Sequence, residues 1–263
     1  MSDESVLFRA SPDGVATITL NRPEVHNAFD GETIERLSDI FEDLHGADGI
    51  RAVLIESTGK SFSAGADLNW MRHAAEASHE DNLEDARVLG EMLRRLDALP
   101  HPTIALVQGA AYGGGVGLLA ACDVVIALKE ARFALTEVRL GLVPAVISPY
   151  VIAAIGPRQA HRYMLTAERF GAIEAYRIGL VHELIDDIAD LPGSAERMVA
   201  RFFAAAPGAV TETKALIARV ANRGVDAQLV EETARLIADV RTRDEAREGV
   251  AAFFEKRKAE WAK

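Results

Sequence analysis

The sequence predicts an α/β fold that ends in an all-helical region, and two observations support this prediction. Over the first half of the chain, short apolar runs typical of strands alternate with segments in which apolar residues recur at helical spacing. From about Ala145 onward the pattern is almost wholly helical, apart from one short strand, VHELI, before Asp186. We therefore expect a body of mixed strands and helices followed by a helical appendage.

In the N-terminal half, VLFRA and VATITL flank the turn SPDG and predict a hairpin that ends before Pro23, which cannot continue a ladder. Asp30 is placed to cap the helix that follows. The apolar stripe of that helix is Ile34, Leu37, Phe41 and Leu44. The elements expected next are a strand at Ala52–Ser57, a helix from about Glu80 to Leu99, the strand HPTIALVQG, the helix GGGVGLLAA and the strand VVIAL.

In the C-terminal half, helices are expected in SPYVIAAIG, PRQAHRYMLT and IEAYRIG. Four more are expected, with breaks at Pro207 and Gly224, around Ala195–Ala206, Ala209–Val220, Val225–Val240 and Asp244–Lys258. We divide the chain into a core, residues 1–205, and a helical region, residues 206–263. Because an amphipathic helical appendage needs a partner surface for its apolar side, this region is expected to mediate self-association.

Composition excludes several classes of function. The chain has 263 residues, 49% of them hydrophobic, which suits a soluble globular protein with a substantial core. Its longest apolar stretches are interrupted by Asp123, Pro144 and Pro149, so no membrane span is expected. The N-terminus lacks a basic start followed by an apolar run, and we expect a cytoplasmic protein. A net charge of −11 argues against nucleic-acid binding.

The sequence lacks the residue patterns that several other catalytic mechanisms require. The single cysteine, Cys122, excludes an intrachain disulfide, and its apolar LLAACD context predicts a buried structural thiol. No HExxH pattern occurs among the seven histidines, so we expect no metal site and no cofactor beyond the substrate itself. Leu118 stands where a dinucleotide fingerprint needs glycine, and Ser61 breaks the GxSxG pattern of a hydrolase nucleophile.

Two glycine-rich turns and one acid form the most informative pattern in the chain. The turns are SAGADLNWM, residues 63–71, and GAAYGGGVGLLAACD, residues 109–123; the acid is Glu137 in ALTEVRLGLVPA. Each turn follows a predicted strand and opens a helix, so its backbone N–H groups are free to bind an anion. Two such turns can hold one developing oxyanion while a nearby carboxylate moves a proton. The apolar surroundings of Glu137 predict partial burial and a raised pKa.

Several segments together resemble the enoyl-CoA hydratase/isomerase (crotonase) superfamily over nearly the whole chain. They are NRPEVHNAF, FSAGADLNWM, VQGAAYGGGVGLLAACDVVIA, FALTEVRLGLVPAVISPYV and IGLVHELI, in this order. The resemblance implies a crotonase-like spiral of ββα turns, an acyl-CoA thioester as ligand, and a homotrimer or a dimer of trimers. It also implies that the N–H groups of Ala66 and Gly114 form an oxyanion hole beside the catalytic Glu137. The substrate contacts that it implies are Ala28, Ala64, Ala66, Asp67, Leu68, Gly113, Gly114, Gly117 and Pro144.

The resemblance has one break. Typical hydratases of the superfamily carry two glutamates, whereas the first of these positions is Gly117 here and only Glu137 remains. Water must then be activated by Glu137 itself or by another side chain, or not at all. The segments AAYGGGVGLLAACD and LTAERF are similar in sequence to those of bacterial hydratases that act on 3-methylglutaconyl-CoA in leucine breakdown. We favour an enoyl-CoA hydratase acting on this or a related branched substrate.

Two alternatives remain open. One is a Δ3,Δ2-enoyl-CoA isomerase, for which a single carboxylate suffices, and the other is an acyl-CoA-binding protein without catalysis. A substrate with a second carboxylate would need a cation at its distal end. Arg72, His73 and Arg139 lie near the motifs in sequence, with no reason to rank one above another.

Overall fold

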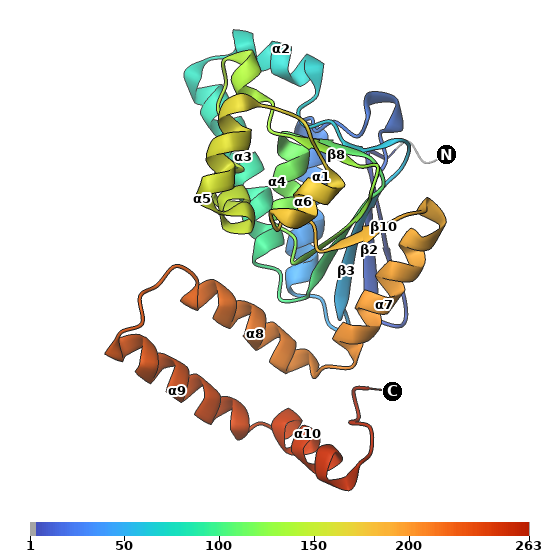
Figure 1. Cartoon of the computed structure of the whole chain (residues 1–263), viewed down its shortest axis with the longest axis vertical. Coiled ribbons are helices and arrows are strands. Elements are labelled where there is room, and N and C mark those ends of the chain that lie inside the picture. The colour runs from blue at the N-terminus through green and yellow to red at the C-terminus, as the bar shows by residue number, and fades with distance from the viewer. Residues whose placement is uncertain (1–3, 263) are drawn as a thin grey trace.

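A computed structural model describes residues 4–262 and contains two β-sheets with helices packed around them (Figure 1). The larger sheet has six strands in the order β1-β2-β3-β5-β7-β10. Its first two strands form the predicted antiparallel hairpin, and the other neighbours are parallel. These strands are β1 (Val6–Ala10), β2 (Val15–Leu20), β3 (Ala52–Ser57), β5 (Thr103–Val107), β7 (Val124–Leu128) and β10 (Glu183–Ile185). The predicted α/β class is confirmed.

The smaller sheet has four short strands in the order β4-β6-β8-β9. The first three are parallel to one another, and the last is antiparallel to its neighbour. Their bounds are β4 (Ser61–Ser63), β6 (Ala110–Tyr112), β8 (Arg132–Ala134) and β9 (Phe170–Gly171). Glycine permits the close approach at the start of β6, because a Cβ on Gly109 would lie 1.9 Å from the Lys60 carbonyl oxygen.

The chain repeats one unit three times. In β3–β4, β5–β6 and β7–β8, the first strand joins the larger sheet and the second joins the smaller one, and helices follow. These successive turns stack into the predicted spiral of ββα units. The helical segments that follow are α2 (Leu68–Glu76) and α3 (His79–Asp97) after β4, α4 (Gly114–Ala120) after β6, and η2 (Glu137–Leu140) and α5 (Ser148–Thr166) after β8. Because β4, β6 and β8 are parallel neighbours, the segments leaving their carboxyl ends lie side by side.

The helix after the hairpin is α1 (Gly31–His45). It is capped as predicted, because the Thr33 N–H donates to Asp30 Oδ1 at 2.9 Å. Its predicted apolar stripe is buried and packs, with the buried Leu93 and Leu96 of α3, into the main core. Two short 3₁₀ segments, η1 (Pro23–Val25) and η3 (Ile188–Asp190), and the helix α6 (Ala172–Arg177) complete the body.

The last helices are α7 (Leu191–Phe203), α8 (Pro207–Val220), α9 (Ala227–Arg241) and α10 (Asp244–Glu255). Figure 1 shows α8, α9 and α10 beyond one end of the body, away from α2. The Arg51 guanidinium joins the two parts by donating to the carbonyl oxygens of Phe203, Ala205 and Trp261. Lys214 of α8 also pairs with Asp123 at 2.6 Å. The division at residue 205 stays a prediction.

Several helix boundaries differ from the predicted ones. The helix expected from Ala195 begins four residues earlier, at Leu191, and ends at Phe203. Pro207 begins α8, since its missing N–H is harmless in a first helical turn. The last helix stops at Glu255, three residues before the expected Lys258, because Lys256 has a left-handed φ of 54°.

Two further features bear on the classes of function excluded above. Within residues 4–262, no helix combines the length and the apolar character that a bilayer span needs. Cys122 is buried as predicted, with its thiol near the Leu118 carbonyl oxygen, and burial raises the pKa of this thiol. A protonated, buried thiol is a poor nucleophile.

Candidate active site

The first glycine turn joins β4 to α2 and is held in place by Asp67. The Asp67 carboxylate caps α2 by accepting from the N–H groups of Asn69 and Trp70, and it pairs with Arg22 at 3.3 Å. Burial opposes its ionisation, but these hydrogen bonds and the Arg22 charge outweigh burial and lower the pKa of Asp67. The turn is therefore fixed, and Ala66 lies just before the cap.

The second glycine turn joins β6 to α4 and touches the first. Gly113 has a φ of 47° and donates its N–H to the Ala134 carbonyl oxygen at 2.9 Å, and Gly114 begins the helix. Contact between the turns depends on Gly65, where a Cβ would lie 2.8 Å from the Tyr112 carbonyl oxygen and 3.5 Å from the Gly114 nitrogen. Two backbone segments from successive ββα turns thus meet at one point.

The N–H groups of Ala66 and Gly114 are two free donors at this point. Across the described part of the chain, neither N–H donates a hydrogen bond to another residue. Both residues line the same two adjoining cavities. Unpaired backbone donors at the start of a helix are suited to bind an anion, which is the arrangement that the predicted oxyanion hole requires.

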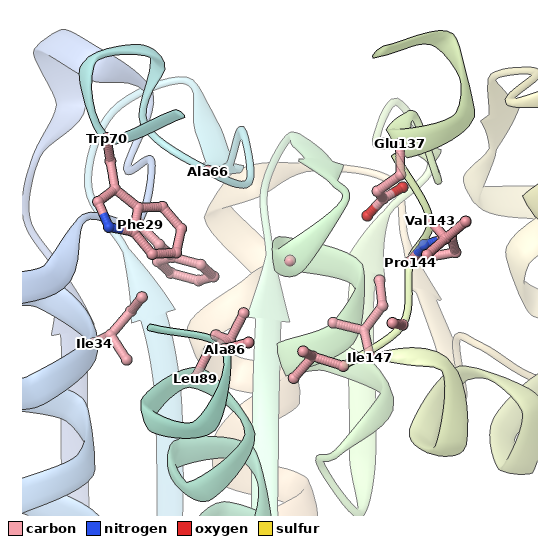
Figure 2. Close-up of a pocket in the computed structure, with 13 residues that line it drawn as sticks. Phe29, Ile34, Ala66, Trp70, Ala86, Leu89, Glu137, Val143, Pro144 and Ile147 are labelled. Carbon is pink, nitrogen blue, oxygen red and sulfur yellow. The ribbon is translucent and has the colours of Figure 1, made fainter. Parts of the chain in front are cut away.

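The two cavities meet at Ala66, Trp70, Gly114 and Glu137, which line both. The smaller has a volume of about 300 Å³. Figure 2 shows Phe29 and Trp70 on one side of it and Glu137 and Ile147 on the other. Its remaining walls are almost wholly apolar: Ile34, Ala86, Leu89, Val143, Pro144, Ala145 and Val146. The larger, of about 850 Å³, extends between α2 and the segment that contains Leu140 and Leu142.

Glu137 is the only titratable side chain among the described residues that line either cavity. Its Oε2 atom is buried and has no hydrogen-bond partner. Burial raises the pKa of Glu137, and a hydrogen bond to its own backbone only partly opposes this shift. A carboxylate with a free oxygen and a raised pKa can exchange a proton with a bound substrate.

This raised pKa predicts the pH dependence of the reaction. To accept a proton, from water or from a 3-enoyl substrate, Glu137 must be ionised, so we expect activity above the pKa of Glu137 and its loss as the pH falls through that value. Because burial raises that pKa, we expect the acid limb of kcat/KM to lie above the usual range of a glutamate. Steady-state rates between pH 4 and 9 measure this. An acid limb in the usual glutamate range would contradict it.

Gly113 lies directly against the Glu137 carboxylate. A Cβ at Gly113 would lie 3.1 Å from Glu137 Oε1, and its φ of 47° is unfavourable for any other residue. We expect Gly113→Ala to lower the free energy of unfolding by about 1–2 kcal/mol and also to lower kcat. The matched control is Gly49→Ala, which has a similarly positive φ of 81° but no neighbour within 4 Å. Denaturant titration and kinetics of both variants measure the difference. Equal kcat in the two would contradict a role for Gly113 in positioning Glu137.

Most predicted site residues line these cavities, although their roles stay predictions. They are Ala64, Ala66, Leu68, Gly113, Gly114, Glu137 and Pro144. Three others line neither cavity, and their role as substrate contacts stays a prediction. Asp67 is occupied by the helix cap and by Arg22, Ala28 is buried with its carbonyl accepting from Arg22, and Gly117 is buried against Ile147.

The candidates for a distal cation also lie elsewhere. Arg72, His73 and Arg139 are exposed, and none of them lines either cavity. The Arg72 guanidinium instead donates to the Asn69 side chain at 3.2 Å.

Sequence reasoning missed the apolar residues that shape the smaller cavity, chiefly Phe29, Trp70 and Ile147. All three lie inside quoted motifs, namely NRPEVHNAF, FSAGADLNWM and FALTEVRLGLVPAVISPYV. Ile147 had an indirect signal, because an acid replaced by Gly117 leaves a volume that some other side chain has to fill.

Comparisons with known proteins agree with this geometry. The family model described as enoyl-CoA hydratase/isomerase matches residues 10–263. A short-chain-enoyl-CoA hydratase from Clostridium acetobutylicum is 32% identical, with 94% of this chain and 93% of that protein covered.

Two solved structures are similar over nearly their full length. An enoyl-CoA hydratase from Shewanella pealeana has a TM-score of 0.94 at 41% identity, covering 98% of this chain and 96% of that one. A Legionella pneumophila protein, provisionally assigned as an enoyl-CoA hydratase/isomerase (crotonase), has a TM-score of 0.92 at 43% identity, covering 99% and 100%. The chain therefore belongs to the enoyl-CoA hydratase/isomerase family of enzymes, in the crotonase superfamily.

Proposed function

We propose that this enzyme adds water to the 2,3 double bond of an enoyl-CoA thioester whose acyl chain is branched and apolar. The observation that carries this proposal is the convergence of two free N–H donors, on Ala66 and Gly114, with the half-buried Glu137 on the same cavities. The names of relatives such as the Clostridium hydratase support the hydration reaction.

The proposed chemistry follows the movement of charge. As water adds at Cβ, negative charge develops on the thioester oxygen, and the N–H groups of Ala66 and Gly114 stabilise it. Glu137 then delivers a proton to Cα. The apolar walls of the smaller cavity exclude bulk water, so that these few polar groups act in a medium of low dielectric constant.

The acyl chain is the finer part of the proposal. The sequence resemblance favours 3-methylglutaconyl-CoA as the substrate, and its acyl chain ends in a second carboxylate. No Lys, Arg or His lies among the described residues that line either cavity, so such a carboxylate would be desolvated without a partner. We therefore expect a branched chain with an apolar end to be preferred over the glutaconyl chain.

The second candidate function is Δ3,Δ2-enoyl-CoA isomerisation. One observation favours it: Glu137 is the single carboxylate among the described lining residues, and one carboxylate can carry a proton between Cγ and Cα. The same donors on Ala66 and Gly114 would stabilise the dienolate.

A panel of four thioesters tests these proposals. We would incubate the enzyme with crotonyl-CoA, 3-methylcrotonyl-CoA, 3-methylglutaconyl-CoA and a 3-enoyl-CoA, and identify products by mass and proton NMR. The two methyl-branched substrates differ only by the terminal carboxylate, so they isolate its effect. A gain of one water, greatest on 3-methylcrotonyl-CoA, supports the proposal.

The other outcomes are equally distinct. Preference for 3-methylglutaconyl-CoA would support the substrate that the sequence resemblance implies, and it would contradict the proposed preference for an apolar acyl chain. Migration of the double bond without a change in mass would establish the isomerase. Binding of every thioester without a product would contradict the proposed reaction.

We also propose that the enzyme assembles as a homotrimer or a dimer of trimers in the cytoplasm. Support for the assembly comes from large apolar side chains exposed on the C-terminal helices, namely Ile217, Val230, Ile237, Phe253 and Phe254. Exposed apolar surface of this kind is typical of subunit interfaces. Sedimentation as a monomer would contradict this proposal.

A further inference from the structure

Gly117 stands where typical hydratases of the superfamily have their first glutamate. At this position a neighbouring side chain leaves no room for any side chain. Gly117 lies in α4, and a Cβ there would lie 2.2 Å from Ile147 Cγ2 and 2.7 Å from Ile147 Cβ. Both distances are far shorter than a van der Waals contact between carbon atoms. No side chain at position 117 can therefore coexist with Ile147 in its present place.

Ile147 is also fixed by its surroundings. It precedes α5, and its carbonyl oxygen accepts from the Val151 N–H at 3.1 Å. The Ser148 hydroxyl donates to the Ala145 carbonyl oxygen at 2.8 Å and closes the turn around it. Its side chain is 3% exposed and branched at Cβ, which leaves it few rotamers. Ile147 therefore cannot easily swing aside.

We propose that Ile147 is the specificity-determining residue that restricts this site to one carboxylate. Its side chain lines the smaller cavity beside Glu137, where Figure 2 shows it on the same side as that acid. It occupies the volume through which an acid on α4 would enter. This inference rests on the proposed hydration, and its consequence is that Glu137 carries out both proton-transfer steps of the reaction, first from water and then to Cα.

The steps balance with a single acid. Ionised Glu137 accepts a proton from water while the water oxygen bonds to Cβ and the π electrons move onto the thioester oxygen as an enolate. Protonated Glu137 then gives that proton to Cα, the thioester carbonyl re-forms, and the carboxylate is regenerated. Both bonds form on the face of the substrate nearest Glu137, so the addition is syn. The free Glu137 Oε2 is available for this exchange.

The first test measures the packing alone. The effect of Gly117→Ala on the unfolding temperature should change sign when Ile147 is shortened. Alanine is more stable than glycine inside a helix, yet Gly117→Ala should lower the unfolding temperature by roughly 3–10 °C because of overpacking. In an Ile147→Gly background the nearest atom to the new Cβ is the Ile147 Cα at 3.8 Å, and Gly117→Ala should then raise the unfolding temperature. Ile147→Ala, which keeps the Cβ at 2.7 Å, should give an intermediate effect and serves if Ile147→Gly does not fold.

The second test measures the chemistry. Gly117→Glu alone should destabilise the enzyme without faster hydration. Gly117→Glu in the Ile147→Gly background should hydrate a 2-enoyl-CoA more than about tenfold faster than Ile147→Gly alone. Its kcat/KM profile should also gain a second ionisation. The matched control is Ala120→Glu in the same background, since Ala120 lies on α4 but lines neither cavity.

Three results would overturn the inference. If Gly117→Ala stabilises both the wild type and the Ile147→Gly variant, the Ile147 side chain can move aside. Gly117→Glu that hydrates faster in the wild-type background would show the same. A sign change in stability with no gain in hydration by the double variant would reduce Ile147 to a packing residue. If the wild-type enzyme moves double bonds without adding water, the proposed hydration fails, while the stability test still decides whether the two residues exclude each other.

Discussion

Replacing Glu137 by Gln is expected to lower turnover by about 10⁴, at the upper end of the range for general acid–base catalysis. The amide has nearly the same shape but cannot accept or deliver the proton. No other titratable group among the described lining residues stands beside it. Steady-state kinetics with the best substrate of the panel measures the loss. Retention of a near wild-type rate would remove Glu137 from the mechanism.

Two controls separate chemistry from folding in this experiment. Acyl-CoA binding by calorimetry should stay close to wild type, because the walls of the cavities are unchanged. The unfolding temperature should hold or rise, since the variant removes a carboxylate charge whose Oε2 atom is buried without a partner. Glu130→Gln, at an exposed acid in the turn before β8, should leave turnover unchanged.

Replacing Gly114 by Pro is expected to lower kcat by about 10²–10³, the usual cost of one oxyanion donor. Proline has no N–H, and it is tolerated at the first residue of a helix, which is the place of Gly114 in α4. Circular dichroism must first show that the variant is folded. A folded variant with an unchanged rate would show that this N–H does not bind the thioester oxygen.

Gly114→Ala is the matched control for that variant. It keeps the N–H and adds a Cβ about as close to the Phe29 ring as the proline would, since the nearest ring carbon lies 3.3 Å away. We expect it to retain most of the activity that Gly114→Pro loses. Equal losses in the two variants would assign the effect to contact with Phe29.

The repeating elements of the fold were predictable because each carries a local signal. The cap at Asp30, the stripe on α1 and the hairpin before Pro23 depend on neighbours in sequence. Helix ends were less predictable, as Lys256 shows, because its left-handed conformation is unusual for a lysine and has no local signature. The stacking of the ββα turns into two sheets depends on contacts between distant segments, and it was expected only from the family resemblance.

The site was predictable in its backbone but less so in its side chains. The glycine turns and Glu137 stood out because glycine at strand-to-helix turns and an acid in an apolar run are unusual in themselves. Ile147 did not stand out, since an isoleucine in an apolar segment is ordinary. Its importance comes from one tertiary contact with Gly117. The hydrogen bonds of Asp67 to α2 and its pairing with Arg22 were not predicted for a related reason, because they are visible only in the folded chain.

The contact between the two glycine turns at Gly65 links the appearance of activity to the order of folding. Ala66 and Gly114 belong to different ββα turns, separated along the chain by α2, α3, β5 and β6. Neither turn alone can hold the thioester oxygen with two donors. During refolding, we therefore expect helical circular dichroism to recover before activity. Catalysis should return only when β4 and β6 have paired and brought the two donors together.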